Sequence, residues 1–278
     1  MKFRAFIILF ATVILWLICA DQNLAQMPPK GERNSENRNF KSRIFLPFRK
    51  KASKEQKRRL LPKNEDLLAH ARLLEQENAG IFRLLPDLGC EDNSLVLKAD
   101  ETCLNAVPES SFYSFREKEY VPELLSDIRL KNNHLITNGL LAQGIIVQLG
   151  DIALEKIGVH SDGIKFLKDY VPPTGSKEIQ KQYHQIARGI KADRYIYHKI
   201  VPALENTTYA LRVVAYKGSV YQSFRGFRFN LLEGDDRADL MLAFRVVRKE
   251  QDGSLTLVWK ELERREAPRL KFEKRTSQ

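Results

Sequence analysis

One hairpin near the end of the chain constrains its fold more than any other feature. Residues 239–263 read DLMLAFRVVRKEQDGSLTLVWKELE, which is two apolar runs joined by Asp252-Gly253. An Asp-Gly pair between β-rich flanks is a strong hairpin signal, because glycine adopts the positive φ that tight turns need. Two turns remain open: a two-residue loop, and a longer loop in which Gly253 forms a bulge. Their registers differ by one residue and exchange which side chains face each other.

The first arm of this hairpin is apolar on both faces. One face carries Leu240, Leu242, Phe244 and Val246. The opposite face carries Met241, Ala243 and Val247. A strand that is apolar on both faces is typical of the middle of a sheet covered on both sides. We therefore predict that the hairpin is the centre of the fold.

The rest of the chain from residue 62 predicts short strands at close spacing and two helices. A helix is expected from Asn64, as its cap, to about residue 78. A second begins near Ser176, with a buried stripe of Ile179, Tyr183, Ile186 and Ile190. Strands are expected over residues 81–85, 111–117, 194–204, 207–216 and 219–232. Residues 127–139 predict a hairpin that turns at Asn132-Asn133, and residues 144–157 predict either a second hairpin or a strand with a Gly-Asp break. The predicted fold is a single α+β domain over residues 62–278, mainly β: an antiparallel sandwich or an open barrel-like sheet with two packed helices.

The N-terminus has the pattern of a secretory signal. Lys2 and Arg4 precede sixteen apolar or small residues, 5–20, and then the polar stretch DQNLAQ. This predicts a signal peptide over residues 1–25, cleaved after Ala25 or, second, after Ala20. An uncleaved anchor stays open, because sixteen residues fall just short of a membrane span. The predicted location is periplasmic or extracellular, with a membrane tether if the signal is kept.

The positive charge of the chain is concentrated in one segment. The whole chain has a net charge of +11, while residues 26–61 hold twelve Lys and Arg against three Glu, a net +9. This segment is rich in Pro, Asn and Ser, which predicts a disordered basic linker. Its aromatic residues among cations indicate contact with an anionic membrane surface or polymer, although a solvated tether also fits. Sequence-specific nucleic-acid binding is not expected, because the charge belongs to a tail and not to a domain.

Two cysteines, Cys90 and Cys103, are left once the signal is removed. An oxidising compartment favours their pairing, and we predict a disulfide between them. In the chain-entropy model it would stabilise the fold by roughly 3 kcal/mol. Two free thiols or a metal site are the alternatives, but two cysteines without a nearby histidine are a poor zinc ligand set.

No common catalytic or cofactor motif is present in the sequence. Gly-x-Ser-x-Gly, His-Glu-x-x-His, a glycine-rich phosphate loop and Cys-x-x-Cys are all missing. We therefore assign no catalytic residue, cofactor or metal ligand. The acidic stretch EGDDRAD, residues 233–239, is interpreted as a solvated loop, with a calcium site as the alternative.

Two arginines interrupt apolar strands and need partners. Arg212 lies in YALRVV and Arg245 in LAFRVV. A buried guanidinium must be paired, so one interpretation is structural, with carboxylates such as Glu205 or Glu261. The other is a carboxylate- or sugar-binding groove in the sheet face, with tyrosines as its walls. The residues of this possible groove are Arg212, Arg245, Tyr195, Tyr197 and Tyr209.

Four segments together carry a resemblance to known proteins: LGDIALEKI, FLKDYVPP, TYALRVVAY and FRVVRKEQDGSLTLVWKEL. The chain resembles, over about residues 65–271, a group of uncharacterised exported bacterial proteins. These share a signal peptide, a Tyr-x-Leu-Arg strand and a closing strand–Asp-Gly–strand element that contains Trp-Lys. The resemblance implies export and the terminal hairpin, and it implies no activity.

The sequence thus predicts an exported or envelope-associated protein that acts as a binding or interaction domain on a basic tether. Whether it is an enzyme is left open, with a non-enzymatic role favoured. The alternative function is an exported hydrolase whose catalytic groups come together only in the fold.

Overall fold

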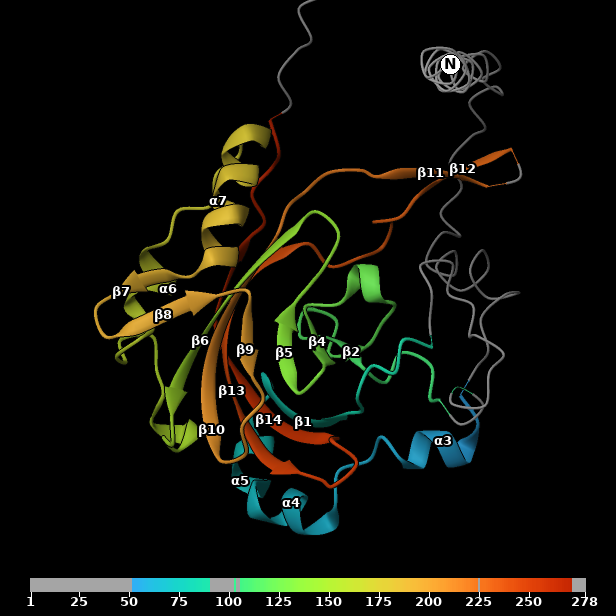
Figure 1. Cartoon of the computed structure of the whole chain (residues 1–278), viewed down its shortest axis with the longest axis vertical. Helices are drawn as coiled ribbons and strands as arrows, with labels where there is room; N and C mark the ends of the chain where they lie inside the picture. Colours follow the sequence, from blue (N-terminus) through green and yellow to red (C-terminus); the bar gives the residue numbers. More distant parts are fainter. Residues whose placement is uncertain (1–51, 91–102, 104–105, 225, 272–278) are drawn as a thin grey trace, which may run out of the picture. The chain divides into compact units, whose positions relative to one another are not determined.

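A computed structural model describes residues 52–90, 103, 106–224 and 226–271 of the chain (Figure 1). All of them lie in the unit from Phe40 to Gln278. Two antiparallel sheets pack together in this unit, with helices on one outer face. The predicted class is confirmed: the protein is α+β and mainly β, and its sheets are open rather than closed into a barrel.

The larger sheet has seven strands, all antiparallel to their neighbours. Across the sheet their order is β1 (Ala79–Leu84), β14 (Leu255–Glu266), β13 (Ala238–Lys249), β10 (Thr207–Ala215), β6 (Ala142–Gly150), β8 (Tyr195–His198) and β7 (Ile190–Ala192). The predicted hairpin is β13–β14, and β13 lies inside the sheet with one face on each of two cores. Its central place in the fold is confirmed.

The turn of this hairpin is the longer of the two expected. Lys249 pairs with Leu255, the Glu250 N–H donates to the Ser254 carbonyl at 2.9 Å, and Gly253 has φ +79°. Residues 251–253 therefore form a three-residue loop inside the Glu250–Ser254 hydrogen bond, and Gly253 occupies the left-handed position at its end. This register places Phe244 opposite Trp259.

The smaller sheet has five strands and packs against one face of the larger. Their order is β3 (Glu119–Tyr120), β2 (Phe112–Ser114), β4 (Ile128–Lys131), β5 (His134–Thr137) and β9 (Ile200–Pro202). Aromatic rings fill the space between the sheets: Phe82 stacks on Tyr113 with centroids 3.6 Å apart, and Phe115 meets Trp259 edge-on at 5.5 Å. Because β8 runs directly into β9, the chain itself ties the two sheets together.

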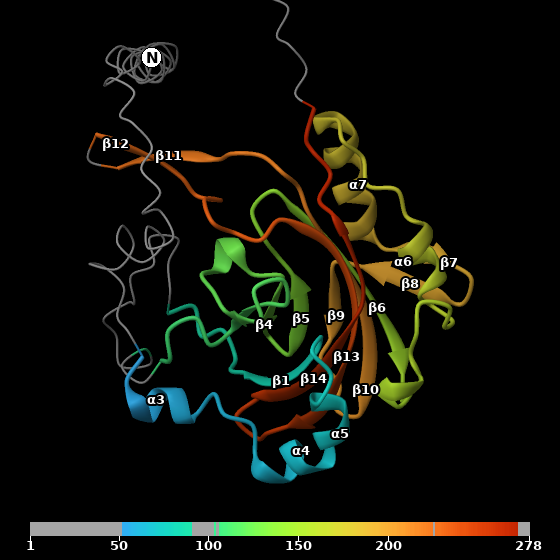
Figure 2. The ribbon, with the colours of Figure 1, turned by 180° about the vertical axis from the view of Figure 1, so that it is seen from behind.

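Short helices cover the other face of the larger sheet (Figure 2). They are α5 (Ala71–Leu74), η4 (Leu154–Lys156), α6 (Lys165–Asp169) and α7 (Ser176–Arg188). Leu73, Leu154, Leu167 and Ile186 from these helices belong to a second core with Ile145 and Val147 of β6. The sheet is thus covered on both sides, as the two apolar faces of β13 require.

The two predicted helices differ in detail from the helices observed. The first is divided at His70 into α4 (Asn64–Ala69) and α5, and Asn64 is its first helical residue rather than its cap. The second begins at Ser176 as predicted, but Tyr183 is 45% exposed. Gln182 takes a place on the inner face, because its amide has a hydrogen-bond partner there in the Tyr170 hydroxyl.

The end of the predicted linker is ordered, so the linker prediction is wrong for these residues. Residues Lys54–Arg58 form α3, which begins with a reciprocal capping box between Ser53 and Gln56. Gln56 Nε2 donates to the Ala106 carbonyl at 2.9 Å, and Arg83 Nη1 donates to the Arg59 carbonyl at 2.8 Å. Residues 53–59 of the predicted linker are therefore attached to the folded unit. The signal and residues 26–51 lie outside the described residues and stay predictions.

Candidate functional site

The five residues of the predicted groove do not line one surface. Tyr209 is buried in the core between the two sheets, while Arg212 and Tyr197 are buried on the helix-covered side. Tyr209 and Arg212 are three residues apart on β10, and an odd spacing in a strand places side chains on opposite faces. The groove prediction is therefore wrong.

Arg212 is instead a fully paired structural residue. Its Nε and Nη2 donate to the two carboxylate oxygens of Asp239 at 2.8 and 2.6 Å. Its Nη1 donates to the carbonyls of Leu167 and Tyr170 at the end of α6, at 2.5 and 2.6 Å. A bidentate pair that also satisfies helix-terminal carbonyls is a strong way to bury a guanidinium. The structural interpretation of Arg212 holds, with Asp239 in place of the suggested glutamates.

The second arginine, Arg245, fastens the turn after β6. Its Nη2 lies 2.7 Å from Asp151 Oδ1, and its Nη1 donates to the Ile152 carbonyl and to Thr208 Oγ1, each at 3.2 Å. Asp151 is 78% exposed, so this pair is worth little by itself. These donors of Arg245 are thus directed to oxygens within the fold.

Tyr195 and Tyr197 have different surroundings. The Tyr197 hydroxyl donates to the Gly163 carbonyl at 3.0 Å, and burial raises the pKa of Tyr197 to about 12. Tyr195 lines an open hollow of about 680 Å³ together with His198. His198 Nδ1 accepts from the Ile200 N–H at 3.0 Å, and burial, with nearby Lys199, lowers the pKa of His198. The hollow thus presents an imidazole that is already hydrogen-bonded to the backbone.

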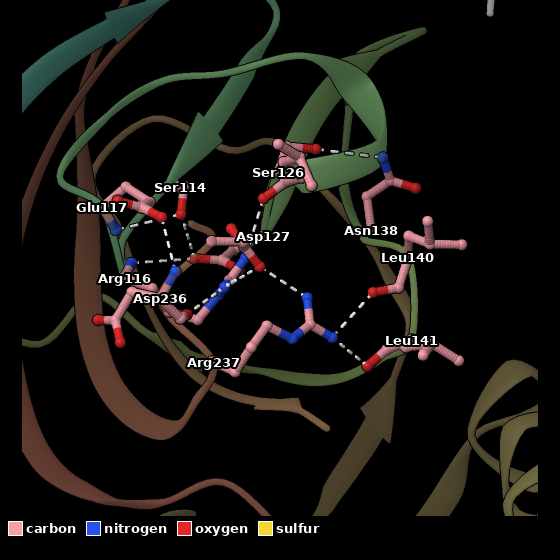
Figure 3. Close-up of polar contacts among 12 residues, drawn as sticks. Ser114, Arg116, Glu117, Ser126, Asp127, Asn138, Leu140, Leu141, Asp236 and Arg237 are labelled. Atoms are coloured by element: carbon pink, nitrogen blue, oxygen red, sulfur yellow. Dashed lines mark hydrogen bonds and ion pairs between the residues drawn. The ribbon is translucent and has the colours of Figure 1, made fainter. Parts of the chain in front are cut away.

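A buried cluster of four charged side chains lies where the chain leaves β2, enters β4 and enters β13 (Figure 3). We call Arg116, Asp127, Asp235 and Arg237 the ion cluster. Arg116 Nε lies 2.7 Å from Asp127 Oδ1, and Arg116 Nη1 lies 2.8 Å from Asp235 Oδ2. Arg237 Nη1 reaches the same Asp235 oxygen at 2.7 Å. The cluster contains two cations and two anions, so its formal charge is zero.

Backbone carbonyls complete the ion cluster. Arg116 Nη2 donates to the Leu125 carbonyl at 2.9 Å, and Arg237 donates to the carbonyls of Tyr216 and Leu140 at 3.0 and 2.9 Å. Burial lowers the pKa of Arg237, against the opposing effect of Asp235. For Arg116, burial also acts to lower the pKa, but Asp127 and Asp235 outweigh it and the pKa is raised. Both guanidiniums stay charged, so the cluster is a cross-link and not an acid–base site.

The contacts of residues 233–239, EGDDRAD, show whether they form a solvated loop or a calcium site. Asp235 bonds Arg116 and Arg237, Asp236 pairs with Arg264 at 2.7 Å, and Asp239 pairs with Arg212. Three of the acidic residues that suggested calcium therefore face arginines. Over the described ranges, no three His, Cys, Asp or Glu side chains are grouped so that they could hold a metal ion. The aspartates of this loop form ion pairs with arginines, so the prediction of a solvated loop is wrong.

The ion cluster stands at the base of a hairpin that leaves the two sheets. β11 (Tyr221–Phe224) and β12 (Phe227–Asn230) pair with each other and, among the described strands, with no other. Both views show this β11–β12 hairpin pointing away from the sheets (Figures 1 and 2). At its base the Lys217 N–H donates to the Pro268 carbonyl at 2.9 Å, and the Asp236 N–H donates to Glu117 Oε1 at 2.7 Å. The expected continuous strand over residues 219–232 is wrong.

The predicted disulfide is confirmed. Cys90 and Cys103 are bonded, and both are buried. A disulfide is compatible with an exported protein, because such bonds persist in oxidising compartments. Among the residues that the structure places, no helix is long and apolar enough to cross a membrane.

Sequence reasoning missed the ion cluster, since its members come from two distant stretches of the chain, residues 116–127 and 235–237, and follow no shared pattern. Comparison of the chain with protein-family models, with curated proteins and with solved structures finds no match.

Proposed function

We propose that this chain is an exported protein that works by binding rather than by catalysis, and that its basic linker holds it beside an anionic surface. The observation that carries the proposal is the separation of charge. Residues 26–61 have a net charge of +9, out of +11 for the whole chain. A short segment of this charge is attracted to anionic lipid or polymer, while a nearly neutral domain is not.

The ordered end of the linker supports this function. Lys54, Lys57 and Arg58 are exposed on α3, and the helix is fastened to the folded unit through Gln56 and Arg59. Cations on a fixed helix bring the domain itself to the surface that they contact. A freely moving tether would instead hold the domain at a distance.

The folded unit adds a second argument. Its buried arginines are paired with carboxylates inside the protein, as Arg116, Arg212 and Arg237 show. Their donors are directed to internal oxygens and not to a cleft. The buried charge therefore belongs to the fold, and most of the net positive charge of the chain lies in the linker.

The test is vesicle binding by the exported protein, purified with the N-terminus that it has after export. We expect binding to vesicles with about 30% anionic lipid to weaken roughly 10- to 100-fold in the Lys54→Gln, Lys57→Gln, Arg58→Gln variant, at about 1 kcal/mol per cation near the surface. The effect should shrink at high salt, since screening is strong beyond about 3 Å at 1 M.

The control has the same total charge. Lys165, Lys181 and Lys191 are exposed on the folded unit, and their replacement by glutamine should leave binding nearly unchanged. Equal losses in the two variants would show that only total charge matters. Failure of the parent protein to bind anionic vesicles or an anionic polymer would contradict the proposed function.

A further inference from the structure

We propose that the hollow beside Tyr195 is a binding site for a small apolar carboxylate, of which a medium-chain fatty acid is the simplest. The site belongs to the folded unit and not to the basic linker. It adds a second ligand to the proposed binding function, and its recognition needs no membrane surface. The inference does not rest on the linker, so the two proposals can be tested separately.

The hollow lies where two neighbouring strands separate. The described pairing of β6 with β8 ends at Val147 and Tyr197. Beyond this pair, β6 continues beside β10, and the start of β8 lies beside β7. Residues 148–150 and 194–196 therefore diverge, and both segments line the hollow. Residues 200–202 of β9 complete its wall, and the volume enclosed is about 680 Å³.

The walls of the hollow are mostly apolar. Each of the three strands contributes aliphatic side chains, which are Leu149, Ile196, Ile200, Val201 and Pro202. The ring of Tyr195 adds an aromatic surface. A concave site of this size, with apolar walls and a few polar groups, is typical of small-molecule binding.

Two polar side chains lie among these walls, Gln148 and His198. The His198 imidazole accepts from the Ile200 N–H at 3.0 Å and is also hydrogen-bonded to the Ala187 backbone. Its capacity is therefore used within the fold. The Gln148 amide is half-buried and has no hydrogen-bond partner among the residues that the structure describes. An amide in this position gains a partner when a ligand oxygen enters.

A guanidinium stands at the mouth of the hollow. Arg194 is 70% exposed, and its Nη2 donates to Asp162 Oδ2 at 2.9 Å and to the Tyr195 hydroxyl at 3.1 Å. Within the described part of the chain, its Nε and Nη1 have no acceptor. Asp162 is 80% exposed, so this ion pair is weak and competes little with a ligand. The free donors of Arg194 match the planar fork of a carboxylate.

The lining defines the class of ligand. Its aliphatic and aromatic walls suit a hydrocarbon body, and its described residues include one cation and no carboxylate. This charge favours an anionic group and disfavours a cationic one. A singly charged carboxylate is favoured over a phosphate, because Arg194 is the single cation of the described lining.

The test compares octanoate with octanamide, which has nearly the same shape without the charge. Calorimetry uses the exported protein, purified with the N-terminus that it has after export. We expect octanoate to bind with a Kd of about 0.1–1 mM, an ordinary value for so small a ligand. Octanamide should bind about three- to tenfold more weakly, and acetate should show no binding. In NMR spectra, octanoate should shift the amide signals of residues 148–150 and 194–202.

Two variants change the hollow at exposed positions. Arg194→Gln should weaken octanoate binding about three- to tenfold and leave octanamide binding unchanged. Its matched control is Arg72→Gln, because Arg72 is exposed on α5, which packs on β1 at the opposite edge of the larger sheet. Ile196→Glu places a carboxylate on a wall that is 54% exposed and should weaken octanoate binding roughly tenfold or more. Val171→Glu, at a position 80% exposed outside the hollow, should have little effect.

Urea unfolding should show that these variants keep the parent stability. If Ile196→Glu unfolds, Arg194→Gln and the NMR shifts of the parent protein decide the outcome. Equal affinities for octanoate and octanamide, or an Arg194→Gln variant that binds octanoate as the parent does, would overturn the inference. Amide shifts outside the hollow, or no octanoate binding, would also overturn it.

The linker variant separates the two proposals. If Lys54→Gln, Lys57→Gln, Arg58→Gln loses octanoate binding, the anion binds to the linker and the hollow is not its site, while the proposed function stands. If octanoate binding is lost in the Arg194 and Ile196 variants alone, the hollow is supported, whether or not the linker binds vesicles.

Discussion

Replacing Trp259 with alanine should lower the free energy of unfolding by about 3–5 kcal/mol, the usual cost of deleting a large buried ring. The Trp259 side chain is 1% exposed in β14, opposite Phe244 and in edge contact with Phe115. Its loss would leave a cavity between the two sheets at the centre of the fold. Urea unfolding of the parent and the variant measures the change.

Gly253→Val at the tip of the same hairpin is the comparison. Its φ of +79° disfavours a β-branched residue, and an added Cβ would lie 3.2 Å from Pro86 Cγ. The expected loss is about 1–3 kcal/mol, which is the range for backbone strain. A neutral Gly253→Val together with a Trp259→Ala change under about 1 kcal/mol would contradict the central place of the hairpin.

Arg116→Met should cost about 3–5 kcal/mol, because it leaves two buried carboxylates without their shared cation. The side chains of Arg116, Asp127 and Asp235 are all 0% exposed. Methionine fills much of the arginine volume, so the loss reports the charge rather than a large cavity. The free energy of unfolding in urea is again the measurement.

The matched control is Arg264→Met. Arg264 pairs with Asp236 at 2.7 Å, but these side chains are 32% and 48% exposed. An exposed pair contributes about 0–1 kcal/mol, so this variant should be nearly silent. Equal losses at Arg116 and Arg264 would show that the ion cluster does not hold the structure as described.

The parts of the fold that the sequence predicted are those with local signals. Asp252-Gly253 locates the turn to within a few residues. The apolar residues on both faces of β13 indicate a strand that is covered on both sides. The disulfide followed from there being two cysteines beyond the signal segment. These inferences need no knowledge of distant contacts.

The sequence shows that the buried arginines need partners, but it does not show which residues those partners are. The sequence marks Arg212 and Arg245 as cations in apolar strands, but their partners, Asp239 and Asp151, depend on the pairing of strands. Arg116 and Asp235 are 119 residues apart, and no period or motif connects them. Long-range ion pairs of this kind are set by the finished fold.

Two misassignments had signals that could have corrected them. The odd spacing of Tyr209 and Arg212 already excludes a shared strand face. Arg225-Gly226, inside the aromatic run YQSFRGFRFN, marks a turn, and Gly226 has φ +82°. Read in this way, residues 221–230 are a hairpin rather than one strand of the main sheet.

The central claim, that the chain works outside the cytosol, is tested most directly by mass spectrometry of the protein from fractionated cells, alkylated without reductant. We expect the protein in the envelope or extracellular fraction, without residues 1–25 and with Cys90 and Cys103 unalkylated. An envelope protein that keeps its N-terminus, with the disulfide intact, fits the tethered form. Protein found in the cytosolic fraction, with both thiols alkylated, would contradict the claim.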